Sequence, residues 1–321
     1  MAPEVIVARD GLGRLAARLA ELGSRRALLL LSPSRRFADP VSAALIGLQP
    51  VLFDGARTHV PAEVVDRAAA LLGSSWADTV VSVGGGSTIG LGKALRLDHA
   101  VRFAAVPTTY SGSEMTSVYG ITRGSDKRTG RDPRVRPDLV LYDATLNEGL
   151  PLGLTVQSLM NGLSHVVGVL GTGSLAGGER AEALVAARRL IQAMEELAAE
   201  PADVQAREDA LVAASAAGTA LDRGKLGAQH ALAHLLGGGL GLDHAALHAV
   251  LLPRTLARLR DADPALAEEL GRAVGRHDLE GYVIDLLTRA GVPRTLDELG
   301  ADRAAVARLV ASRPDLAELV D

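Results

Sequence analysis

The sequence of 321 residues contains no cysteine. Without thiols, the chain cannot form a disulfide scaffold, a zinc–thiolate site, an iron–sulfur cluster or a thiol nucleophile. Aromatic residues make up only 2% of the chain, so its core must be aliphatic and rich in alanine. This scarcity counts against functions that need base stacking or an aromatic cage.

An excess of basic charge is also missing. The chain has 34 lysines and arginines against 38 acidic residues, which gives a formal net charge of −4. Proteins that bind nucleic acid usually show a basic excess or a basic stripe, so we expect no nucleic-acid partner. The N-terminus shows no targeting signal, and its longest apolar run, Ala27–Leu31, is far too short to span a membrane. We therefore expect a cytoplasmic protein without a membrane partner.

The first half of the chain alternates helical periodicity with short apolar runs that read as buried strands. The predicted strands are Ala27–Leu31, Val51–Phe53, Thr79–Val83, Phe103–Val106 and Leu139–Tyr142, and the predicted helices are Leu12–Leu22 and Pro61–Leu72. Apolar strands separated by helices are typical of a parallel sheet covered on both faces. Between them we predict a hairpin, with arms Val118–Thr122 and Arg134–Val140 and a basic tip.

After about Pro151, strand-like runs disappear and helical periodicity rich in Ala, Leu, Arg and Glu continues to the end. The clearest predicted helices are Glu179–Ala199, Ala206–Leu221, Leu226–Leu236 and His244–Leu259. We therefore predict two domains, an α/β domain over 1–150 and an all-helical domain over 151–321.

A glycine-rich turn follows the predicted strand Thr79–Val83. It consists of Gly84, Gly85, Gly86, Ser87 and Thr88. Successive glycines let the backbone approach a bulky anion, and the helix that follows offers N–H groups and a positive dipole end. The alternative is a tight turn between strand and helix. Three glycines cost stability that a turn alone does not require, so we favour a pyrophosphate site.

A second polar stretch leaves the predicted strand Phe103–Val106, and it includes Thr108, Thr109, Ser113 and Thr116. Small hydroxyls after a parallel strand fit the ligand crevice of an open α/β sheet, although a solvated loop would have the same composition. The basic tip of the predicted hairpin carries Lys127, Arg128, Arg131 and Arg134. Such a run is either a solvated surface or a source of arginines that grip a substrate carboxylate.

Histidines are concentrated in the second half. Four of the eight fall between 230 and 248, and they include the pair His230 and His234, with His244 beginning the next helix after a glycine-rich break. Asn161 and His165 form a similar i, i+4 pair upstream, so each pair lies on one side of its helix. Buried polar groups need partners, and the partners here are each other, a substrate or a metal. A divalent metal would want a carboxylate besides imidazoles, whereas this set offers the neutral amide of Asn161.

The order and spacing of these segments resemble the iron-containing alcohol dehydrogenase superfamily and, within it, the maleylacetate reductase branch. The segments that carry the resemblance lie between about residues 10 and 255: GGGSTIGLGKA, PTTYSGSEMT, YGIT, KRTGRDPRVRPDLVLYD, LPLGLTVQSLMNGLSH, HALAHLLGG and DHAALHAVLLP. The resemblance implies an N-terminal α/β dinucleotide-binding domain and an all-α C-terminal domain, as in dehydroquinate synthase-like folds. It also implies a homodimer that acts on a small-molecule substrate.

The resemblance assigns roles to the polar residues named above. It implies that Gly84, Gly85, Gly86, Ser87 and Thr88 hold the pyrophosphate of NAD(H) or NADP(H), and that Thr108, Thr109 and Ser113 line the nicotinamide side. The catalytic residues it implies are Asn161, His165, His230, His234 and His244, and we expect Arg131, Lys127 and Tyr110 to contact the substrate. Metal-dependent members use an Asp where this chain has Asn161, so we expect no required metal. A metal, if present, would be bound by His165, His230 and His244.

The expected reaction is hydride transfer from NAD(P)H to an unsaturated or keto dicarboxylic acid, in aromatic degradation or a specialised biosynthetic pathway. This chain departs from the branch where it reads HVVGVLGTG in place of HAxEALYA, and QHALAH in place of HHKLCH. These departures keep two alternatives open. One is a non-redox lyase, isomerase or cyclase that reuses the fold and the histidines, and the other is a non-catalytic homologue.

Overall fold

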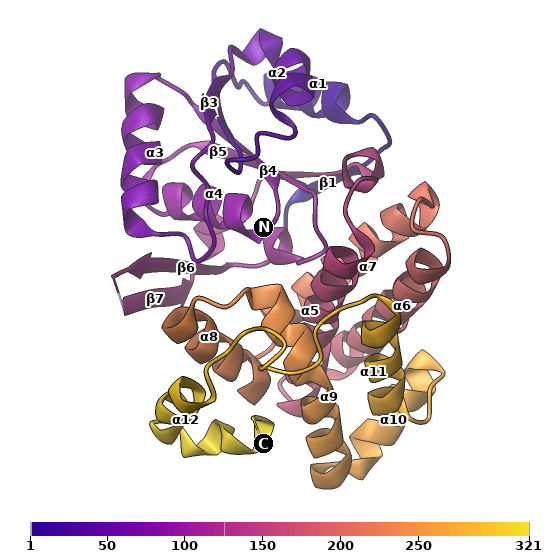
Figure 1. Cartoon of the computed structure of the whole chain (residues 1–321). Helices are drawn as coiled ribbons and strands as arrows, with labels where there is room; N and C mark the ends of the chain where they lie inside the picture. Colours follow the sequence, from indigo (N-terminus) through magenta and orange to yellow (C-terminus); the bar gives the residue numbers. More distant parts are fainter. Residues whose placement is uncertain (1, 125, 321) are drawn as a thin grey trace. The chain divides into compact units, whose positions relative to one another are not determined.

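Six strands of the first half pair side by side in one parallel sheet, in the order β1-β8-β5-β4-β2-β3. This arrangement is seen in a computed structural model, which describes residues 2–124 and 126–320 (Figure 1). The strands are β1 Glu4–Val7, β2 Ala27–Leu30, β3 Val51–Phe53, β4 Thr79–Gly84, β5 Arg102–Pro107 and β8 Leu139–Tyr142. The helices between them are α1 Leu12–Glu21, α2 Ala38–Ala44, α3 Ala62–Ser74 and α4 Gly86–Asp98.

Helices cover both faces of this sheet, as the apolar strands predict. Alternate strand residues such as Leu29 and Val81 join Leu15 and Leu19 of α1 in one buried cluster, because successive strand residues point to opposite faces. On the other face α4 packs so closely that a Cβ at Gly92 would lie 2.4 Å from the ring of Phe103. The prediction of a parallel α/β sheet is confirmed.

The strand order indicates where on this sheet a ligand is expected to bind. From β2 the chain moves outward to β3, whereas β4 begins on the opposite side of β2 and leads on to β5 and β8. Open parallel sheets bind ligands beyond the carboxyl ends of their strands at such a reversal. The glycine-rich turn that follows β4 lies at this position.

The predicted hairpin forms with a different second arm. β6 (Val118–Arg123) pairs antiparallel with β7 (Asp126–Arg131), so the stretch expected as a basic tip is itself a strand. Gly124 adopts a positive φ of 59° between the two arms, which places the reversal before the basic residues rather than after them. The expected arm Arg134–Val140 is divided between a 3₁₀ turn, Pro133–Val135, and the start of β8.

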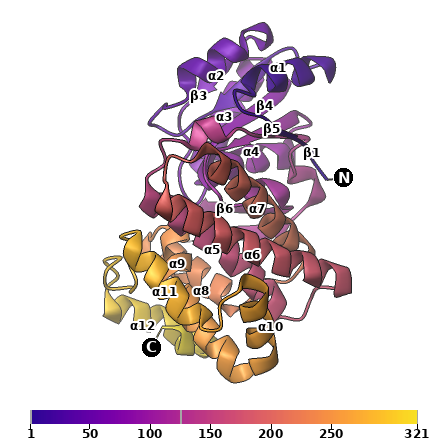
Figure 2. The ribbon, with the colours of Figure 1, turned by 90° about the vertical axis from the view of Figure 1, so that its right-hand side faces the viewer.

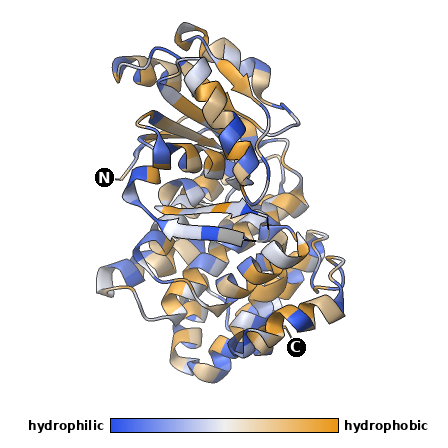
Figure 3. Cartoon of the chain, turned by 90° about the vertical axis from the view of Figure 1, so that its left-hand side faces the viewer, coloured by the Kyte–Doolittle hydropathy of each residue, from blue (hydrophilic) through white to orange (hydrophobic). Residues whose placement is uncertain are grey.

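The second half is helical throughout the described residues. Its helices are α5 Leu152–Gly171, α6 Gly177–Ala199, α7 Val204–Arg223, α8 Ala228–Leu240, α9 His244–Ala262, α10 Pro264–Val274, α11 Leu279–Arg289 and α12 Arg303–Ala311. α5 is buried along most of its length and packs against α6, α7, α8, α9 and α11 (Figure 2). Figure 3 shows hydrophobic and hydrophilic residues mixed along these helices, as expected where one side of each helix meets the core.

α8 is longer than predicted. We expected the glycines after Leu236 to break the helix, but it continues through them to Leu240. It ends where Gly241 takes up the left-handed conformation with φ 67°, a common way for a helix to stop.

The chain divides into two units by its internal contacts. Met1–Thr109 and Ser113–Gly149 form the first, while Tyr110–Gly112 and Leu150–Asp321 form the second. Tyr110 belongs to the helical unit because its backbone N–H donates to Ser158 Oγ at 2.8 Å, and its hydroxyl accepts from Arg207 at 3.3 Å. Arg207 is wholly buried in α7 and also donates to the carbonyl oxygen of Leu150 at 3.1 Å. A short segment of the first half is thereby fixed within the helical unit.

Candidate active site

The glycine-rich turn of the first unit has the backbone conformation that only glycine adopts easily. Gly84 ends β4 with φ 145°, and a Cβ there would lie 2.8 Å from Thr88 Oγ1. Gly85 is the N-cap of α4, which begins at Gly86. The first N–H groups of a helix have no partner within the helix, so this turn can bind the oxygens of a phosphate.

The second predicted loop lies against the first. Thr108 N–H donates to the carbonyl oxygen of Gly84 at 3.0 Å, and a Cβ on Gly85 would lie 3.0 Å from Thr109 Oγ1. Thr88 Oγ1 donates to the carbonyl oxygen of Gly85 at 2.9 Å, so it stabilises the turn. The structure thus brings together residues 84–88 and 108–109, which the sequence assigned to one dinucleotide site.

Lys93 of α4 is a buried residue that sequence reasoning did not single out. Its ammonium donates to the carbonyl oxygens of Ser113 at 2.6 Å and Val118 at 2.9 Å, and to Thr116 Oγ1 at 2.8 Å. Because Ser113 is one of the predicted nicotinamide residues, Lys93 fixes the loop that carries it. A lysine inside a predicted helix is usually a solvated cation, so nothing in the sequence pattern indicates this role.

The three predicted substrate residues have different surroundings. Arg131 is exposed at the end of β7, and the side chain of Lys127 lies outside the described part of the chain. Tyr110 is wholly buried, and its ring and hydroxyl are occupied within the helical unit. Arg131 is therefore exposed on the surface of its own unit, whereas Tyr110 is not.

Five histidines converge in the second unit. α5 contributes His165, α8 contributes His230 and His234, and α9 contributes His244 and His248. The ring centroids of His230 lie 5.3 Å from His165, 4.8 Å from His234, 5.2 Å from His244 and 4.6 Å from His248. The i, i+4 spacing on α8 and α9 puts each pair on one side of its helix, and the packing of these helices brings the pairs together. His230 is thus the centre of the cluster.

The start of α9 is fixed by a cap. Asp243 precedes the helix, and its carboxylate accepts from the N–H of Ala246 at 2.9 Å. An N-cap of this type typically contributes about 1 kcal/mol. It also places His244 in the first turn, with His248 one turn later.

Burial keeps three of these imidazoles neutral. Removal from water lowers the pKa of His165 to about 4, and the neighbouring His234 contributes further. Burial also lowers the pKa of His230 and of His248 well below the usual value, and the neighbouring histidines of the cluster are a smaller cause. Neutral imidazole is the form that accepts a proton or binds a metal.

Several buried polar atoms around the cluster lack a hydrogen-bond partner among the described residues. They are Asn161 Oδ1, His165 Nδ1, His230 Nδ1 and His248 Nε2. Such atoms cost about 1–3 kcal/mol each when they stay unpaired, so native proteins usually satisfy them with water or a ligand. The cluster is built to receive a group that hydrogen-bonds to imidazoles or coordinates them.

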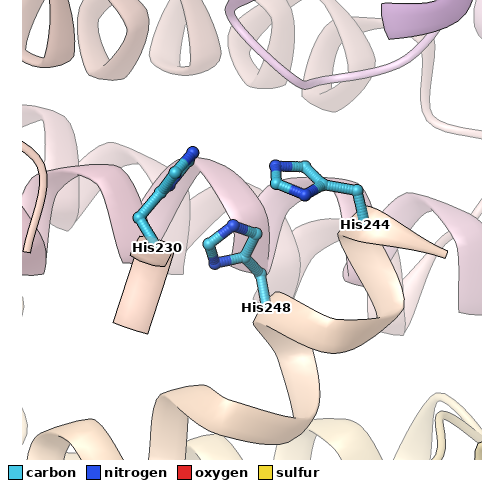
Figure 4. Close-up of side chains that lie close together, drawn as sticks. All are labelled: His230, His244 and His248. Atoms are coloured by element: carbon cyan, nitrogen blue, oxygen red, sulfur yellow. The ribbon is translucent and has the colours of Figure 1, made fainter. Parts of the chain in front are cut away.

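A divalent transition metal fits this donor set. His230, His244 and His248 each offer a ring nitrogen, and these nitrogens lie within 4.8 Å of one another (Figure 4). In Figure 4 the three rings surround a common space, with His230 on one helix and the other two on the next. Imidazole nitrogen suits iron and zinc, and three protein ligands leave a position for substrate or water. His248 was not among the predicted site residues, although its i, i+4 spacing from His244 is the pattern that singled out His230 and His234.

Both halves of the chain match models of one family. Residues 2–144 match the model described as iron-containing alcohol dehydrogenase, and residues 155–314 match the C-terminal model of the Fe-containing alcohol dehydrogenase family. The chain belongs to the iron-containing alcohol dehydrogenase family. It is 38% identical to maleylacetate reductase 1 of Cupriavidus pinatubonensis over 306 residues, which cover 94% of this chain and 85% of the relative.

Solved structures of the family show the same fold. The maleylacetate reductase of Agrobacterium tumefaciens superposes with a TM-score of 0.88 at 35% identity, over 98% of this chain and 91% of that one. An iron-containing alcohol dehydrogenase of Corynebacterium glutamicum gives 0.91 at 30% identity, over 98% and 88%. This family member is therefore an NAD(P)-dependent oxidoreductase, and more closely an NAD(P)H-dependent reductase acting on a small molecule. Among the described residues, no helix is long and apolar enough to cross a membrane.

The expectation that no metal is required is wrong. Membership of a family that is named for its iron contradicts it, and the histidine cluster gives the physical reason for the error. The expectation rested on Asn161 in place of a carboxylate, as though that ligand were indispensable. Imidazoles alone can hold a divalent cation, and the count of imidazoles had omitted His248.

Proposed function

We propose that this reductase acts on an unsaturated or keto dicarboxylic acid of the maleylacetate type. The similarity to maleylacetate reductase 1 over 94% of the chain is the observation that supports this substrate class. The residues of the first unit supply a dinucleotide site, and those of the second supply a cluster of neutral imidazoles. The non-redox alternative gives the glycine-rich turn no function, yet Gly84 has a positive φ of 145°, a conformation that residues other than glycine rarely adopt.

In this proposal the first unit holds the dinucleotide through backbone groups. The N-terminal turn of α4 binds the pyrophosphate, and Thr108, Thr109 and Ser113 orient the nicotinamide ring. When bound, the reduced nicotinamide supplies a hydride. The buried ammonium of Lys93 keeps the Ser113 loop in place, so the orientation does not have to be established anew in each turnover.

The second unit completes the reduction with its own side chains. Hydride addition to the β-carbon of a C=C conjugated to a ketone leaves an enolate, and one proton at the α-carbon then completes the addition of two hydrogens. We assign that proton to His234, which lies in the cluster and is only half-buried. Asn161 and His165 contribute hydrogen bonds to the substrate oxygens.

His230, His244 and His248 would hold the metal ion. When bound, a divalent cation supplies Lewis-acid chemistry at a carbonyl oxygen. Burial lowers the pKa of His230 and of His248, so these two rings are already neutral, which is the ligating form, and neither has to lose a proton before coordination. Arg131 remains our candidate for a second substrate carboxylate.

The test is turnover by the metal-loaded enzyme. Purified protein is loaded with Fe²⁺ without oxygen and given NADH or NADPH with maleylacetate, or with the analogue that lacks the far carboxylate. We expect stoichiometric loss of nicotinamide absorbance with the dicarboxylate and much slower loss with the analogue. Equal rates for the two would contradict the dicarboxylate assignment, and substrate loss without nicotinamide oxidation would establish the non-redox alternative.

The homodimer and the cytoplasmic location stay predictions. Light scattering of the purified protein in the micromolar range measures the first directly. Fractionation of the source cells with an antibody to the chain tests the second.

A further inference from the structure

The ends of three neighbouring strands determine the course of a bound dinucleotide along the first unit. The glycine-rich turn follows β4, and the loop with Thr108 and Thr109 follows β5, which pairs with β4 on one side. β2 pairs with β4 on the other side, in a register that sets Leu30 opposite Ser82. With the pyrophosphate at the turn and the nicotinamide beside β5, the adenosine half lies beyond the carboxyl end of β2. The residues that follow β2 are therefore the ones that meet its ribose.

A tight turn follows β2 and determines where Arg35 lies. The carbonyl oxygen of Ser32 accepts from the N–H of Arg35 at 3.0 Å, and Pro33 occupies the second position, where a β-turn favours proline. Ser32 Oγ and Ser34 Oγ lie 2.9 Å apart. Arg35 has a positive φ of 52°, which is uncommon for a residue other than glycine. The turn thus supplies two hydroxyl groups and one guanidinium at the carboxyl end of β2.

The residue types in this turn suit a phosphate better than a ribose hydroxyl. The adenosine ribose of NAD(H) has a free 2′-hydroxyl, which a carboxylate at the end of such a strand usually binds, whereas NADP(H) has a 2′-phosphate, which an arginine accommodates. Residues 31–37 include two arginines and no carboxylate. Guanidinium and hydroxyl groups donate hydrogen bonds, and phosphate oxygens accept them.

Of the two arginines, Arg35 is the one available to a ligand. Arg36 donates to the carbonyl oxygen of Gly149 at 3.2 Å, and its guanidinium lies 5.1 Å from the ring centroid of Phe37. The side chain of Arg35 is 57% exposed, and its Nε lies 3.6 Å from Asp54 Oδ2, beyond hydrogen-bond distance. An exposed ion pair of this kind contributes little, so the Arg35 guanidinium can turn to a phosphate.

Asp54, which directly follows β3, acts in the opposite sense. Its carboxylate repels a nearby phosphate and is able to accept from a ribose hydroxyl. The loops after β2 and β3, residues 31–37 and 54–60, nevertheless contain three arginines against this single aspartate. Their formal charge is 3 − 1 = +2, so the charge around Arg35 favours an anionic ligand.

We propose that Arg35 determines the cofactor specificity of this enzyme, because its guanidinium, with the hydroxyls of Ser32 and Ser34, binds the 2′-phosphate of NADPH. The inference rests on the dinucleotide site of the proposed function and adds which dinucleotide that site prefers. A guanidinium is planar and donates in pairs, so it matches two oxygens of one phosphate. Hydrogen bonds between charged groups are strong enough to make NADPH bind about 10–100-fold more tightly than NADH.

Dinucleotide binding in the absence of substrate tests the proposal. Purified protein is titrated separately with NADPH and NADH, with nicotinamide fluorescence as the readout, at one ionic strength throughout. We expect the Kd for NADPH to be about 10–100-fold lower than that for NADH. In Arg35→Gln the NADPH affinity should fall to the level of NADH, while NADH affinity stays within a few-fold of the parent. Equal affinities in the parent, or an equal loss for both dinucleotides in Arg35→Gln, would overturn the proposal.

Arg25 provides a matched control. It is exposed just before β2, at the opposite end of the same strand from Arg35. Arg25→Gln removes the same charge, so it should leave both dissociation constants unchanged. If Arg25→Gln weakened NADPH binding as much as Arg35→Gln, the net charge and not a contact at the ribose would set the preference, and the proposal would be wrong.

Asp54→Asn separates the two members of the ion pair. Its NADPH affinity should stay the same or rise, because a repulsive carboxylate is lost, and its NADH affinity should change little. A selective loss of NADH binding would instead assign the ribose hydroxyls to Asp54 and contradict the proposal. Failure of the parent to bind either dinucleotide would overturn the dinucleotide site together with this proposal, whereas equal binding of both would overturn the proposal alone.

Discussion

Gly112 and Gly218 meet backbone to backbone within the helical unit. A Cβ on Gly218 would lie 2.1 Å from the carbonyl oxygen of Gly112, and a Cβ on Gly112 would lie 2.4 Å from the carbonyl oxygen of Ala214. Gly112 also has a positive φ of 68°. No side chain fits between these two segments, so the contact demands glycine on both sides.

Gly218→Ala should therefore destabilise the protein by about 3 kcal/mol or more, because neither backbone can move without disturbing α7. Gly178→Ala is the control, since a Cβ at that position of α6 would contact nothing within 4 Å. Alanine there should be neutral or stabilising by up to about 1 kcal/mol. Urea denaturation of both variants measures the difference, and equal midpoints would contradict the close contact.

Gly85→Val should abolish dinucleotide binding. A Cβ at Gly85 already approaches Thr109 Oγ1 to 3.0 Å, and the two added methyl groups would occupy the space that the pyrophosphate needs. We expect NADH affinity to fall roughly 100-fold or more, about 2.7 kcal/mol. Gly73→Ala in α3, with nothing within 4 Å of its Cβ, should bind NADH normally. Nicotinamide fluorescence measures both, and undiminished affinity in Gly85→Val would refute the assignment of the loop.

His248→Gln and His165→Gln should differ in metal binding. The ring nitrogens of His230, His244 and His248 form the close group, while the His165 ring lies 6.0 Å from His248 between centroids. Loss of a ligand should weaken Co²⁺ binding roughly 100-fold, whereas His165→Gln should change it by less than about 10-fold. The reverse order in a competitive titration would return the third ligand position to His165.

His234→Ala should separate proton transfer from metal binding. We expect kcat for the dicarboxylate to fall about 100-fold, as when a general acid is removed. Co²⁺ affinity should stay within a few-fold of the parent, because His234 is outside the close group of three. Near-normal turnover would remove His234 from the mechanism.

Glu114 gives the first unit a pH-dependent stability. Its carboxyl is buried, and burial raises its pKa despite the hydroxyl of Tyr142, its own backbone amide and the charge of Lys93, which all lower it. Between the ordinary value of 4.5 and the raised one, the folded state binds more protons than the unfolded state, so stability falls as pH rises. The glutamine of Glu114→Gln does not ionise, so it causes no fall in stability with rising pH. Its amide oxygen can still accept from the hydroxyl of Tyr142. The variant should gain stability over the parent as pH rises from about 5 to 8 in urea titrations. Parallel curves would mean that Glu114 ionises with its ordinary pKa.

The sequence predicted the parts of the fold that follow from local pattern. The run Thr79–Val83 and the three glycines after it predict β4 to within one residue and a helix directly behind the turn, because apolar runs and glycine punctuation act locally. β1 was missed, since Glu4–Val7 is a short edge strand whose residues are largely exposed and show no buried run. The pattern after Gly124 predicts a basic tip and not a strand, because the residues of β7, DKRTGR, are polar and show no apolar alternation.

The sequence predicts some residues of the candidate site and not others, because only some of them follow from local pattern. Spacing on one helix identified His230 and His234, but which of the five histidines form the closest group depends on how α5, α8 and α9 pack. Lys93 could not be found from the sequence, because it acts through backbone carbonyls that only the folded loop places nearby.

Because residues 110–112 belong to the helical unit, the gene cannot be divided into two modules by one cut near residue 150. A fragment that starts at Leu150 lacks Tyr110, which is a hydrogen-bond partner of both Ser158 and the buried guanidinium of Arg207. It also lacks the backbone of Gly112, which packs against Gly218. A chimera that exchanges the helical half with a relative must therefore carry over Tyr110, Ser111 and Gly112 from the same parent. A chimera joined near residue 150 would otherwise combine residues 110–112 of one parent with the Ser158, Arg207 and Gly218 of the other.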